Sequence, residues 1–406
     1  MKWPLVKIGE YSEIVSGSTP KTNIEEYWNG DVHWVTPKDI SGLDGIYIYN
    51  TNKKISKKGL ESCSTHLLPS GSVLLSSRAP IGLLAINGVP MCTNQGFKSI
   101  IPEKGKLHNE FLYFYLKSKR EYLNSIGNGA TFKEISKESF SKVLIPLPPL
   151  DDQIRIATLL SKVESLISRR RDQLKHLDEL LKSVFLEMFG DPVRNEKGWM
   201  RVTIRDLILE AKYGTSKSAE GGRYKYLRMN NISTNGFWNF TSLKYIDIDD
   251  YEVSKYSLLR NDLVFNRTNS KELVGKTAVY SSDEKVIIAG YLIRVRTKPE
   301  ANPWYIWGYL NSKAGKLRLF NLCRNIVGMA NINAQELQDI PILKPPIELQ
   351  NQFADIVEKV EGIRSHYQQS LTEQENLYGV LIQKAFKGVL DLSRVSLGSQ
   401  MSCFGA

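Results

Sequence analysis

The sequence predicts a mixed α/β fold made of two similar halves, each consisting of a domain with irregular β structure followed by a long helix. Three observations predict this fold. A segment recurs 197 residues after its first appearance, and an apolar seam with heptad spacing runs through both copies of it. The remaining sequence is rich in short apolar runs between Gly, Pro, Asn and Ser, which indicate strands and turns.

The internal repeat is clearest where Pro148-Pro149-Leu150-Asp151-Asp152-Gln153 is matched by Pro345-Pro346-Ile347-Glu348-Leu349-Gln350. Past both openings the apolar positions keep the same spacing, with matched pairs at Ile156/Phe353, Leu159/Ile356, Leu160/Val357, Val163/Val360, Leu166/Ile363, Leu174/Leu371, Leu180/Leu377 and Phe189/Phe386. Repeats in solenoid proteins are about 20 to 50 residues long. The much longer period therefore indicates two related halves joined in one chain.

Residues 151–189 are expected to form one long helix, because they contain no Pro and no Gly and their apolar residues alternate spacings of three and four. Asp151 and Asp152 lie in the first turn, where the helix dipole favours negative charge, and Gly190 follows as a stop signal. At 1.5 Å per residue this helix is about 58 Å long, longer than a small domain is wide. The length favours a coiled coil over the alternative interpretation, an ordinary core helix.

The second copy of the helix begins in the same way and has a more polar seam, with Arg364, Tyr367 and Gln374 at seam positions. Arg170 of the first copy aligns with Tyr367, so each seam has a polar interruption in the same register. Such interruptions tend to fix the register and the partner of a coiled coil. The apolar residues expected to form its core are Leu160, Val163, Ile167, Leu174, Leu177, Leu181, Val184, Val357, Val360, Leu371 and Leu381.

The two regions outside the helices also match each other, and we interpret each as a mixed α/β domain. Residues 34–41 line up with residues 226–233, and their apolar positions correspond while their polar positions differ. Two copies of one scaffold with different polar residues are expected to bind different surfaces. Strands are expected in apolar runs at residues 72–75, 89–92 and 286–289, and helices at residues 109–122 and 303–319.

Positive charge is concentrated in these two domains. The chain has a net charge of +11, and Lys plus Arg exceed Asp plus Glu by 5 in residues 1–150 and by 8 in residues 191–344. The balance is 0 in residues 151–190 and −2 in residues 345–406. Two basic domains joined by nearly neutral helices are suited to a polyanion that is contacted at two places.

Metal sites, disulfide frameworks and membrane anchors are not indicated. Cys63, Cys92, Cys323 and Cys403 are scattered without a C-x-x-C pair, and Cys63 with His66 lacks further ligands, so we expect no metal. No apolar run reaches about 18 residues, and the first residues lack the apolar stretch of a signal peptide. We therefore expect a cytoplasmic protein with no membrane partner.

Signatures of enzymes are incomplete in this sequence. Gly275-Lys276-Thr277 looks like the end of a P-loop, but Ser270 occupies the position of its first glycine. An adenine methyltransferase would carry an aromatic residue after its Pro-Pro pair, whereas Leu150 and Ile347 stand there. Since no glycine-rich cofactor loop is found either, we expect a non-catalytic chain without a cofactor.

Three segments resemble the specificity subunit of type I restriction-modification systems. They are Trp28-Asn29-Gly30-Asp31-Val32-His33-Trp34-Val35-Thr36-Pro37-Lys38-Asp39-Ile40, Gly129-Ala130-Thr131-Phe132-Lys133-Glu134-Ile135 and Ile145-Pro146-Leu147-Pro148-Pro149-Leu150-Asp151-Asp152-Gln153-Ile154. The resemblance covers nearly the whole chain. It departs at the second junction, where Pro341 and Pro345 are separated by two residues more than Pro146 and Pro148.

The resemblance implies two DNA target-recognition domains at residues 1–150 and 191–344, two antiparallel spacer helices at residues 151–190 and 345–390, and a C-terminal tail at residues 391–406. Each domain would read one half of a bipartite, asymmetric site in double-stranded DNA. The helices would set the spacing between the half-sites and dock two methyltransferase subunits. Restriction and translocase subunits would join through the methyltransferase complex, and the specificity subunit itself would be non-catalytic.

The side chains expected to contact DNA are those whose functional groups can bind bases or phosphates. Arg and Lys recognise guanine and phosphate, and Asn and Gln recognise adenine. Those in expected loops are Lys38, Arg78, Asn94, Gln95 and Lys133 in the first domain, and Arg228, Asn230, Asn231, Arg267, Asn269, Lys271, Arg324 and Asn325 in the second. The run Arg169-Arg170-Arg171 lies on the first helix, where it either is a solvated face or contacts DNA phosphates or an acidic partner surface.

Two other functions remain open at this stage. A non-catalytic coiled-coil adaptor would explain the helices and leaves the basic charge of the domains unexplained. A stand-alone DNA-binding regulator would bind DNA without a partner protein. An adaptor would bind DNA weakly and without sequence preference, whereas a specificity subunit would keep its preference as salt rises.

Overall fold

The structure is a computed structural model that describes residues 3–129, 133–326 and 329–396, with residues 324–326 described by their backbone alone. The chain divides into two compact units. Unit 1 comprises Met1–Asp172 and Gln369–Ala406, and unit 2 comprises Gln173–Gln368. Each unit therefore contains one α/β domain together with half of each long helix.

Two long helices, α6 (Leu150–Phe189) and α12 (Ile347–Lys387), confirm that both copies of the repeated segment are helical. Both end at a glycine in the left-handed region, Gly190 with φ 77° and Gly388 with φ 73°, a conformation that favours glycine. The amide of Gly190 also donates to the carbonyl of Leu186 at 2.8 Å, which satisfies one of the last carbonyls of α6.

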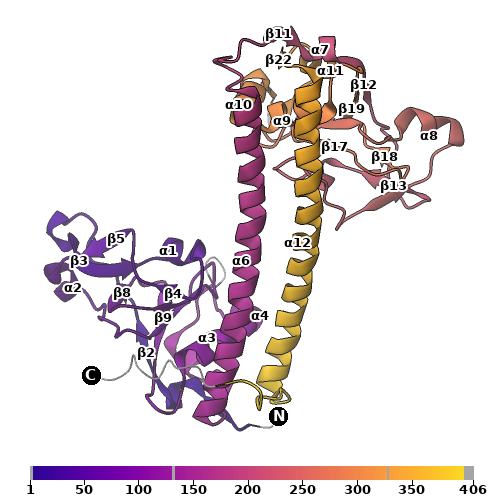
Figure 1. The fold of residues 1–406 in the computed structure, drawn as a ribbon. Helices are drawn as coiled ribbons and strands as arrows, with labels where there is room; N and C mark the ends of the chain where they lie inside the picture. Colours follow the sequence, from indigo (N-terminus) through magenta and orange to yellow (C-terminus); the bar gives the residue numbers. More distant parts are fainter. Residues whose placement is uncertain (1–2, 130–132, 327–328, 397–406) are drawn as a thin grey trace. The chain divides into compact units, whose positions relative to one another are not determined.

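Within each unit the two helices run side by side and antiparallel (Figure 1). In unit 2, Asp178 of α6 pairs with Arg364 of α12, and Phe185 farther along α6 packs on Phe353 at the start of α12. In unit 1, Arg171 pairs with Glu375, and Phe386 packs in the same core cluster as residues near the start of α6. The expected core positions Leu160, Val163, Ile167, Leu181, Val357, Val360 and Leu371 are buried, and Leu174, Leu177, Val184 and Leu381 are partly buried.

The described residues of the domain of unit 1 form three sheets. A five-stranded sheet has the order β2 (Ser12–Ser16), β9 (Phe97–Pro102), β6 (Val73–Ser76), β7 (Leu84–Asn87) and β4 (Tyr47–Ile48). A three-stranded sheet has the order β5 (Lys53–Ile55), β3 (Trp28–Val35) and β8 (Met91–Thr93), and β1 (Leu5–Lys7) pairs with β10 (Leu144–Pro146). Helices α1 (Pro37–Ser41), α2 (Lys57–Glu61), α3 (Asn109–Ser118), α4 (Arg120–Ser125) and α5 (Lys137–Ser141) complete this domain, with 3-10 turns at Ile8–Glu10 and Glu25–Tyr27.

The domain of unit 2 repeats this arrangement. Its main sheet has the order β12 (Ile208–Tyr213), β19 (Leu292–Thr297), β15 (Leu263–Asn266) and β17 (Thr277–Val279). The second sheet has the order β14 (Lys244–Ile246), β13 (Tyr224–Leu227) and β18 (Ile287–Ile288). The strand β11 (Met200–Thr203) pairs with β22 (Pro341–Lys344). A small third sheet has the order β16 (Thr268–Asn269), β21 (Met329–Asn331) and β20 (Arg324–Ile326). Its helical segments are α7 (Ile204–Leu207), η3 (Met229–Asn231), α8 (Asp250–Tyr256), α9 (Pro303–Asn311), α10 (Lys313–Leu322) and α11 (Ala334–Gln338).

Strand pairing confirms the predicted internal repeat. The strand β3 runs parallel to β8, and β13 runs parallel to β18. The strands β6 and β15 are each flanked by two antiparallel neighbours in the same order. The mixed α/β fold with irregular strands is therefore present twice. The expected helices at residues 109–122 and 303–319 are each broken in two, because Lys119 and Ser312 leave the helical conformation.

In each unit, the side chain of a buried glutamine forms hydrogen bonds that join the domain to the first turns of the long helix that follows it. The Gln153 side chain accepts a hydrogen bond from the amide of His108 at 2.8 Å and donates to the carbonyl of Pro148 at 2.9 Å. Its repeat counterpart Gln350 accepts from Asn302 at 2.9 Å and donates to Pro345 at 2.8 Å. The two extra residues between the prolines of the second junction therefore leave the geometry of this attachment unchanged.

Each unit has its own hydrophobic core, to which both long helices contribute. In unit 1, Ile156 and Leu160 of α6 and Phe386 of α12 pack with the domain, and Leu392 of the C-terminal tail is also buried there. In unit 2, Phe185 of α6 and Phe353 of α12 pack with Tyr305 of α9 and other residues of the domain. The helices are thus integral to both domain cores. Residues 397–406 of the tail lie outside the described residues.

Candidate nucleic-acid interface

In unit 1, backbone hydrogen bonds bring the predicted DNA-binding residues into one group of loops. The Asn94 amide donates to the Val35 carbonyl at 3.1 Å, the Ser77 amide to Gly96 at 2.7 Å, and the Ile135 amide to Ser77 at 2.9 Å. These bonds connect the ends of β3, β6 and β8 with the segment after residue 132. The loops carry Lys38, Arg78, Asn94, Gln95 and Lys133.

The side chains of this group differ in how they are held. Lys38, the second residue of α1, and Lys133 are exposed. Arg78 is exposed and its Nε donates to Glu134 at 2.8 Å. Gln95 accepts a hydrogen bond from the Thr19 hydroxyl. These four cationic or amide side chains are therefore exposed, or held by a neighbouring side chain, at this surface.

Glu134 is the residue that organises the basic side chains in unit 1. It accepts hydrogen bonds from Arg78 at 2.8 Å and from Lys98 at 3.2 Å. Burial alone would raise the pKa of Glu134, but the hydrogen bonds from these two cations lower it, so the carboxylate stays ionised at neutral pH. The sequence contains this glutamate in one of the three family-like segments, and only the fold reveals its two partners.

In unit 2, the predicted residues from three distant segments also come together. The Ile332 amide donates to the Arg267 carbonyl at 2.9 Å, which repeats the bond between Ile135 and Ser77 in unit 1. The strands β16, β21 and β20 join the segments that carry Asn269, Arg324 and Asn325. The Asn269 side chain contacts the sulfur of Met229 at 3.6 Å, which connects β16 to the turn η3. The side chains of Arg324 and Asn325 lie outside the described residues.

Most cations of this group rest on aromatic rings or loop carbonyls. The guanidinium of Arg267 lies 4.7 Å from the centre of the Tyr213 ring, and its Nε donates to the Asn331 side chain at 3.2 Å. Lys271 lies 4.3 Å from the centre of the Phe320 ring. Such contacts orient a cation without neutralising it. Sequence reasoning missed Tyr213, Asn331 and Phe320, because their contacts arise from strand pairing and helix placement.

Two neighbouring asparagines in the turn η3 have different roles. Asn230 is exposed. Asn231 is 1% exposed, and its side chain accepts from the Arg228 amide at 2.9 Å and donates to the carbonyls of Asn239 and Ser242. Arg228 donates to Ser242 as well, at 3.0 Å. Asn231 thus shapes the loop, whereas Asn230 is available to a ligand.

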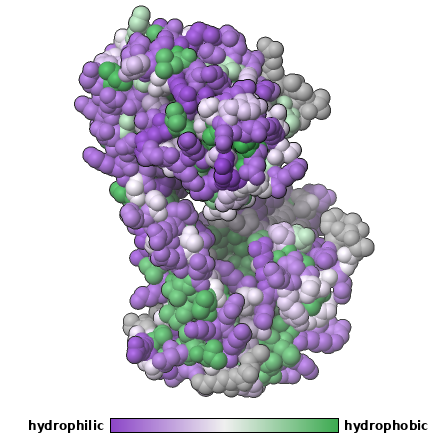
Figure 2. Space-filling model, turned by 90° about the vertical axis from the view of Figure 1, so that its right-hand side faces the viewer, coloured by the Kyte–Doolittle hydropathy of each residue, from purple (hydrophilic) through white to green (hydrophobic). Residues whose placement is uncertain are grey.

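The long helices carry a second surface, formed by matched apolar residues beside the seam. Leu166 and Leu377 belong to unit 1, and their repeat counterparts Ile363 and Leu180 belong to unit 2; all four are between 44% and 50% exposed. In the heptad all four precede an a position and therefore occupy g positions. In an antiparallel pair the g positions of both helices flank the same side of the seam. Figure 2 shows a mostly hydrophilic surface on which hydrophobic side chains gather in patches.

The seam itself contains a buried ionic cluster in unit 2. Arg364 forms an ion pair with Asp178 across the helices. Its Nε lies 3.1 Å from the Glu361 carboxyl group, and its guanidinium lies 4.0 Å from the centre of the Phe237 ring. Burial raises the pKa of Glu361 to about 8 and lowers the pKa of Arg364 to about 10, because the buried environment disfavours each charge. Asp178 is therefore the carboxylate that balances Arg364 at neutral pH.

The run Arg169-Arg170-Arg171 is only partly a solvated face. Arg171 pairs with Glu375 of α12 at 2.6 Å, and Glu375 is the repeat counterpart of Asp178. The two acidic residues therefore occupy equivalent positions of the repeat. The arginine that pairs with them comes from α6 in unit 1 and from α12 in unit 2. Arg169 is exposed.

The structure gives no support to a nucleotide site at Gly275-Lys276-Thr277. Thr277 begins the strand β17, whereas a P-loop lysine and its Ser or Thr open a helix. Among the described residues, no group of three or more His, Cys, Asp or Glu side chains is placed to hold a metal ion. In the same part of the chain, no helix is long and apolar enough to cross a membrane.

Solved structures share this fold. The S subunit of a type I restriction-modification system from M. genitalium has a TM-score of 0.58 at 14% identity, with 95% of this chain and 96% of that chain covered. A chain from a structure that describes complex assembly and conformational transition of the type I R-M system has a TM-score of 0.53 at 19% identity, with 96% and 98% covered.

Sequence relatives name the family. The chain is 34% identical over 294 residues to the type I restriction enzyme MjaIX specificity subunit of Methanocaldococcus jannaschii, an alignment that covers 66% of each protein, just under two thirds. It is 24% identical over 341 residues to the EcoKI specificity subunit of Escherichia coli, covering 77% of this chain and 73% of that relative. The family model described as the type I restriction modification DNA specificity domain matches residues 1–176 and 196–373. Because that match includes most of both halves, the chain belongs to the type I restriction-modification DNA specificity family.

Proposed function

We propose that this chain gives a type I restriction-modification complex its DNA sequence specificity, with each unit reading one half of a bipartite, asymmetric site in double-stranded DNA. The observation that carries the proposal is a scaffold present twice with different polar side chains in equivalent loops. At the end of β3, unit 1 has Thr36-Pro37-Lys38, and at the end of β13, unit 2 has Arg228-Met229-Asn230. Different donors and acceptors at the same place favour two different half-sites.

The chemistry of these loops supports contact with DNA. Lys38, Lys133 and Arg78 in unit 1, and Arg267 and Lys271 in unit 2, provide cations for phosphates or guanine. Asn94, Gln95, Asn230 and Asn269 provide amides for adenine. We leave Asn231 out of the contacting set, because its amide is buried and bonded to the backbone.

The long helices are proposed to set the number of unread base pairs between the half-sites. Both α6 and α12 continue from one unit into the other without a break. Each helix end is packed into a domain core, so a change in helix length would change the distance between the two domains. A helix of 40 residues spans about 60 Å, enough to hold two bulky domains near one DNA turn apart, roughly 34 to 36 Å.

The matched apolar g positions are proposed to dock two copies of one methyltransferase subunit. Leu166 with Leu377 in unit 1 and Leu180 with Ile363 in unit 2 form two equivalent patches related by the internal repeat. Two equivalent patches fit two copies of the same partner. Restriction and translocase subunits then join through the methyltransferase complex, and the chain itself supplies recognition without catalysis.

The test is to map methylated adenines across the host genome with the gene intact and deleted. We expect a gapped, two-part, asymmetric motif to lose its methylation on deletion. Unchanged methylation in a host that expresses the neighbouring methyltransferase would contradict the proposal. In that case, binding of the purified chain to DNA at rising salt separates the remaining functions, since an adaptor has no sequence preference and a stand-alone regulator needs no partner.

A further inference from the structure

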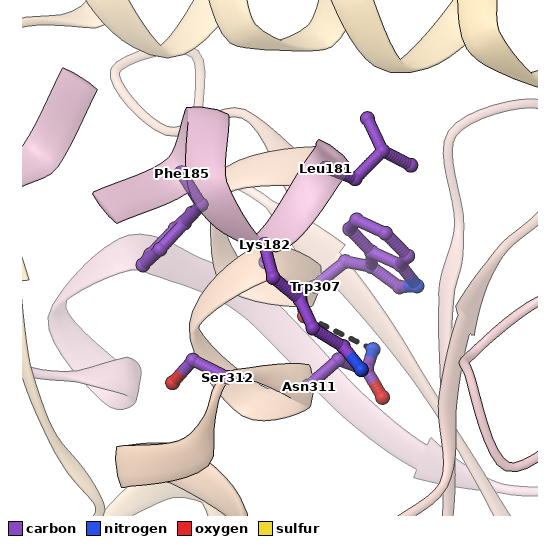
Figure 3. Close-up of a pocket in the computed structure, with 7 residues that line it drawn as sticks. Leu181, Lys182, Phe185, Trp307, Asn311 and Ser312 are labelled. Atoms are coloured by element: carbon purple, nitrogen blue, oxygen red, sulfur yellow. Dashed lines mark hydrogen bonds between the residues drawn. The ribbon is translucent and has the colours of Figure 1, made fainter. Parts of the chain in front are cut away.

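An open pocket of about 280 Å³ in unit 2 is lined by three lysines from three different segments of the chain. Lys182 comes from α6, Lys276 immediately precedes β17, and Lys316 comes from α10. Thr234, Asn235, Glu272, Leu273 and Asn311 complete its lining. Lys182 and Asn311 also line a smaller adjacent pocket, and Figure 3 shows the Lys182 side chain extending from α6 toward Asn311 of α9.

The three lysines of this pocket outnumber its one lining carboxylate, Glu272. Among the residues that the structure describes, none forms an ion pair with Lys182, Lys276 or Lys316. Glu272 lines the pocket, but it is exposed and accepts hydrogen bonds from its own backbone and from Ser270. Burial, together with the nearby charges of Lys276 and Lys182, lowers the pKa of Lys316 to about 8. A bound anion would relieve this repulsion.

The fold itself does not require the lysines. Strand register aligns Thr277 of β17 with Leu84 of β7, so Leu83 in unit 1 corresponds to Lys276. The spacing of the repeat aligns Lys182 with Gly379. Unit 1 therefore builds the same scaffold without a lysine at either of these two positions, which indicates that unit 2 carries Lys182 and Lys276 for a ligand.

The pocket is connected directly to the turn η3. The buried ammonium group of Lys276 donates to the carbonyls of Met229 at 2.7 Å and Ile232 at 2.5 Å, on both sides of Asn230 and Asn231. Glu272 and Leu273 follow Lys271 in the same loop. An anion held between Lys182 and Lys316 would thus lie beside the loops proposed to read bases.

We propose that this pocket binds a backbone phosphate of the DNA next to the half-site read by unit 2, with Lys182 and Lys316 as its ligands and Lys276 as the link to the turn η3. The inference rests on the proposed DNA-reading function. DNA is favoured over an acidic protein segment because the same loops line the pocket and carry the proposed base contacts.

The first experiment compares the full chain, in complex with its methyltransferase, with the double variant Lys182→Gln/Lys316→Gln. Lys276 is left in place because its amine holds the turn. We expect the slope of log affinity against log salt for a motif-bearing duplex to fall by about 0.9, the value for one lost phosphate contact. Base preference in both half-sites should stay unchanged. The control is Lys313→Gln, an exposed lysine on α10 that does not line the pocket.

A wild-type slope and affinity in the double variant would overturn the phosphate site. A wild-type complex without any sequence preference would instead overturn the proposed function, and the slope on a random duplex would still test the phosphate contact. The two failures are therefore distinguishable.

The second experiment measures acetylation rates of individual lysines by mass spectrometry. Duplex DNA should slow acetylation of Lys182 and Lys316 several-fold and leave Lys313 unchanged. Equal protection by millimolar inorganic phosphate alone would assign the pocket to free phosphate. Protection by the methyltransferase in the absence of DNA would assign it to an acidic protein segment and overturn the inference.

Discussion

At the scale of single residues, Asn230 and Asn231 are neighbours with opposite roles, and their variants should separate recognition from stability. Asn231→Ala removes a buried amide that satisfies three backbone groups, so we expect a loss of about 1 to 3 kcal/mol in the free energy of unfolding. Asn230→Ala removes an exposed side chain and should leave stability unchanged. It should weaken base discrimination in one half-site by about 1 to 3 kcal/mol.

Urea denaturation and methylation mapping of both variants measure these two effects. Loss of discrimination in both half-sites by Asn230→Ala would contradict the assignment of one half-site to each unit. Equal stability of Asn231→Ala and the natural protein would contradict its role in shaping the loop.

Glu361 gives unit 2 a dependence of stability on pH. Burial raises its pKa from 4.5 to about 8, so between these values the folded chain holds a proton that the unfolded chain releases. Stability is therefore expected to fall as pH rises through this window. Glu361→Gln cannot ionise, and its advantage should grow by about 1 to 2 kcal/mol toward pH 8, a reduced figure because the side chain is 33% exposed and screened by solvent.

Urea denaturation of both proteins from pH 5 to about pH 8.5 tests this expectation. Glu358→Gln, which removes an exposed carboxylate three residues away on the same helix, is the matched control. Parallel stability curves for the natural protein and Glu361→Gln would show that Glu361 is ionised throughout.

At the scale of elements, variants of two adjacent leucines of α6 test the helix seam and the proposed docking face separately. Leu181 is 2% exposed and Leu180 is 46% exposed. Leu181→Ala should lower the free energy of unfolding by about 2 to 5 kcal/mol, because it leaves a cavity in the core of unit 2. Leu180→Ala should change stability little and weaken the binding of one methyltransferase copy.

Native mass spectrometry of the assembled complex measures the second effect. Leu377→Ala, the repeat counterpart of Leu180→Ala, should weaken the other copy, and the double variant should lose both. Retention of two copies with unchanged affinity by the double variant would place the docking surface elsewhere.

The elements also show which parts of the fold can be predicted from sequence. Helices α6 and α12 were predictable because heptad spacing, the absence of Pro from both and of Gly from α6, and a terminal glycine all act locally. The break at Ser312 was missed, although a serine at this position caps α10 by accepting from Gly315 at 3.1 Å. The role of Asn231 was not predictable, because its partners Asn239 and Ser242 are fixed by a loop with no regular pattern. The same holds for the lysine pocket, whose members lie far apart in sequence and meet only through packing.

At the scale of the whole molecule, the repeat makes the scaffold symmetric and leaves the ligand-facing side chains asymmetric. The glutamine attachments at Gln153 and Gln350 are nearly identical, as are the strand orders of the two domains. The basic loops, the lysine pocket and the origin of the seam arginine differ between the units. A symmetric frame suits two copies of one partner subunit, and asymmetric loops suit a target with two different halves.

The proposed spacing role of the helices can be tested by inserting one heptad into both, after Asp172 in α6 and after Gln368 in α12. A heptad keeps the seam in register and lengthens each helix by about 10.5 Å, close to three base pairs of DNA. We expect the methylated motif to keep both half-sites and to gain about three unread base pairs. Three more base pairs also turn one half-site around the DNA axis relative to the other, so methylation should be weaker as well as shifted.

The matched control inserts the heptad into α6 alone, which puts the two helices out of register and should abolish assembly. Methylation mapping in a host that carries each variant gives the motif directly. Changed half-sites would contradict the proposal, because they would mean that the helices take part in base recognition. An unchanged gap would also contradict it, because the distance between the half-sites would then be set by the methyltransferase subunits and not by this chain.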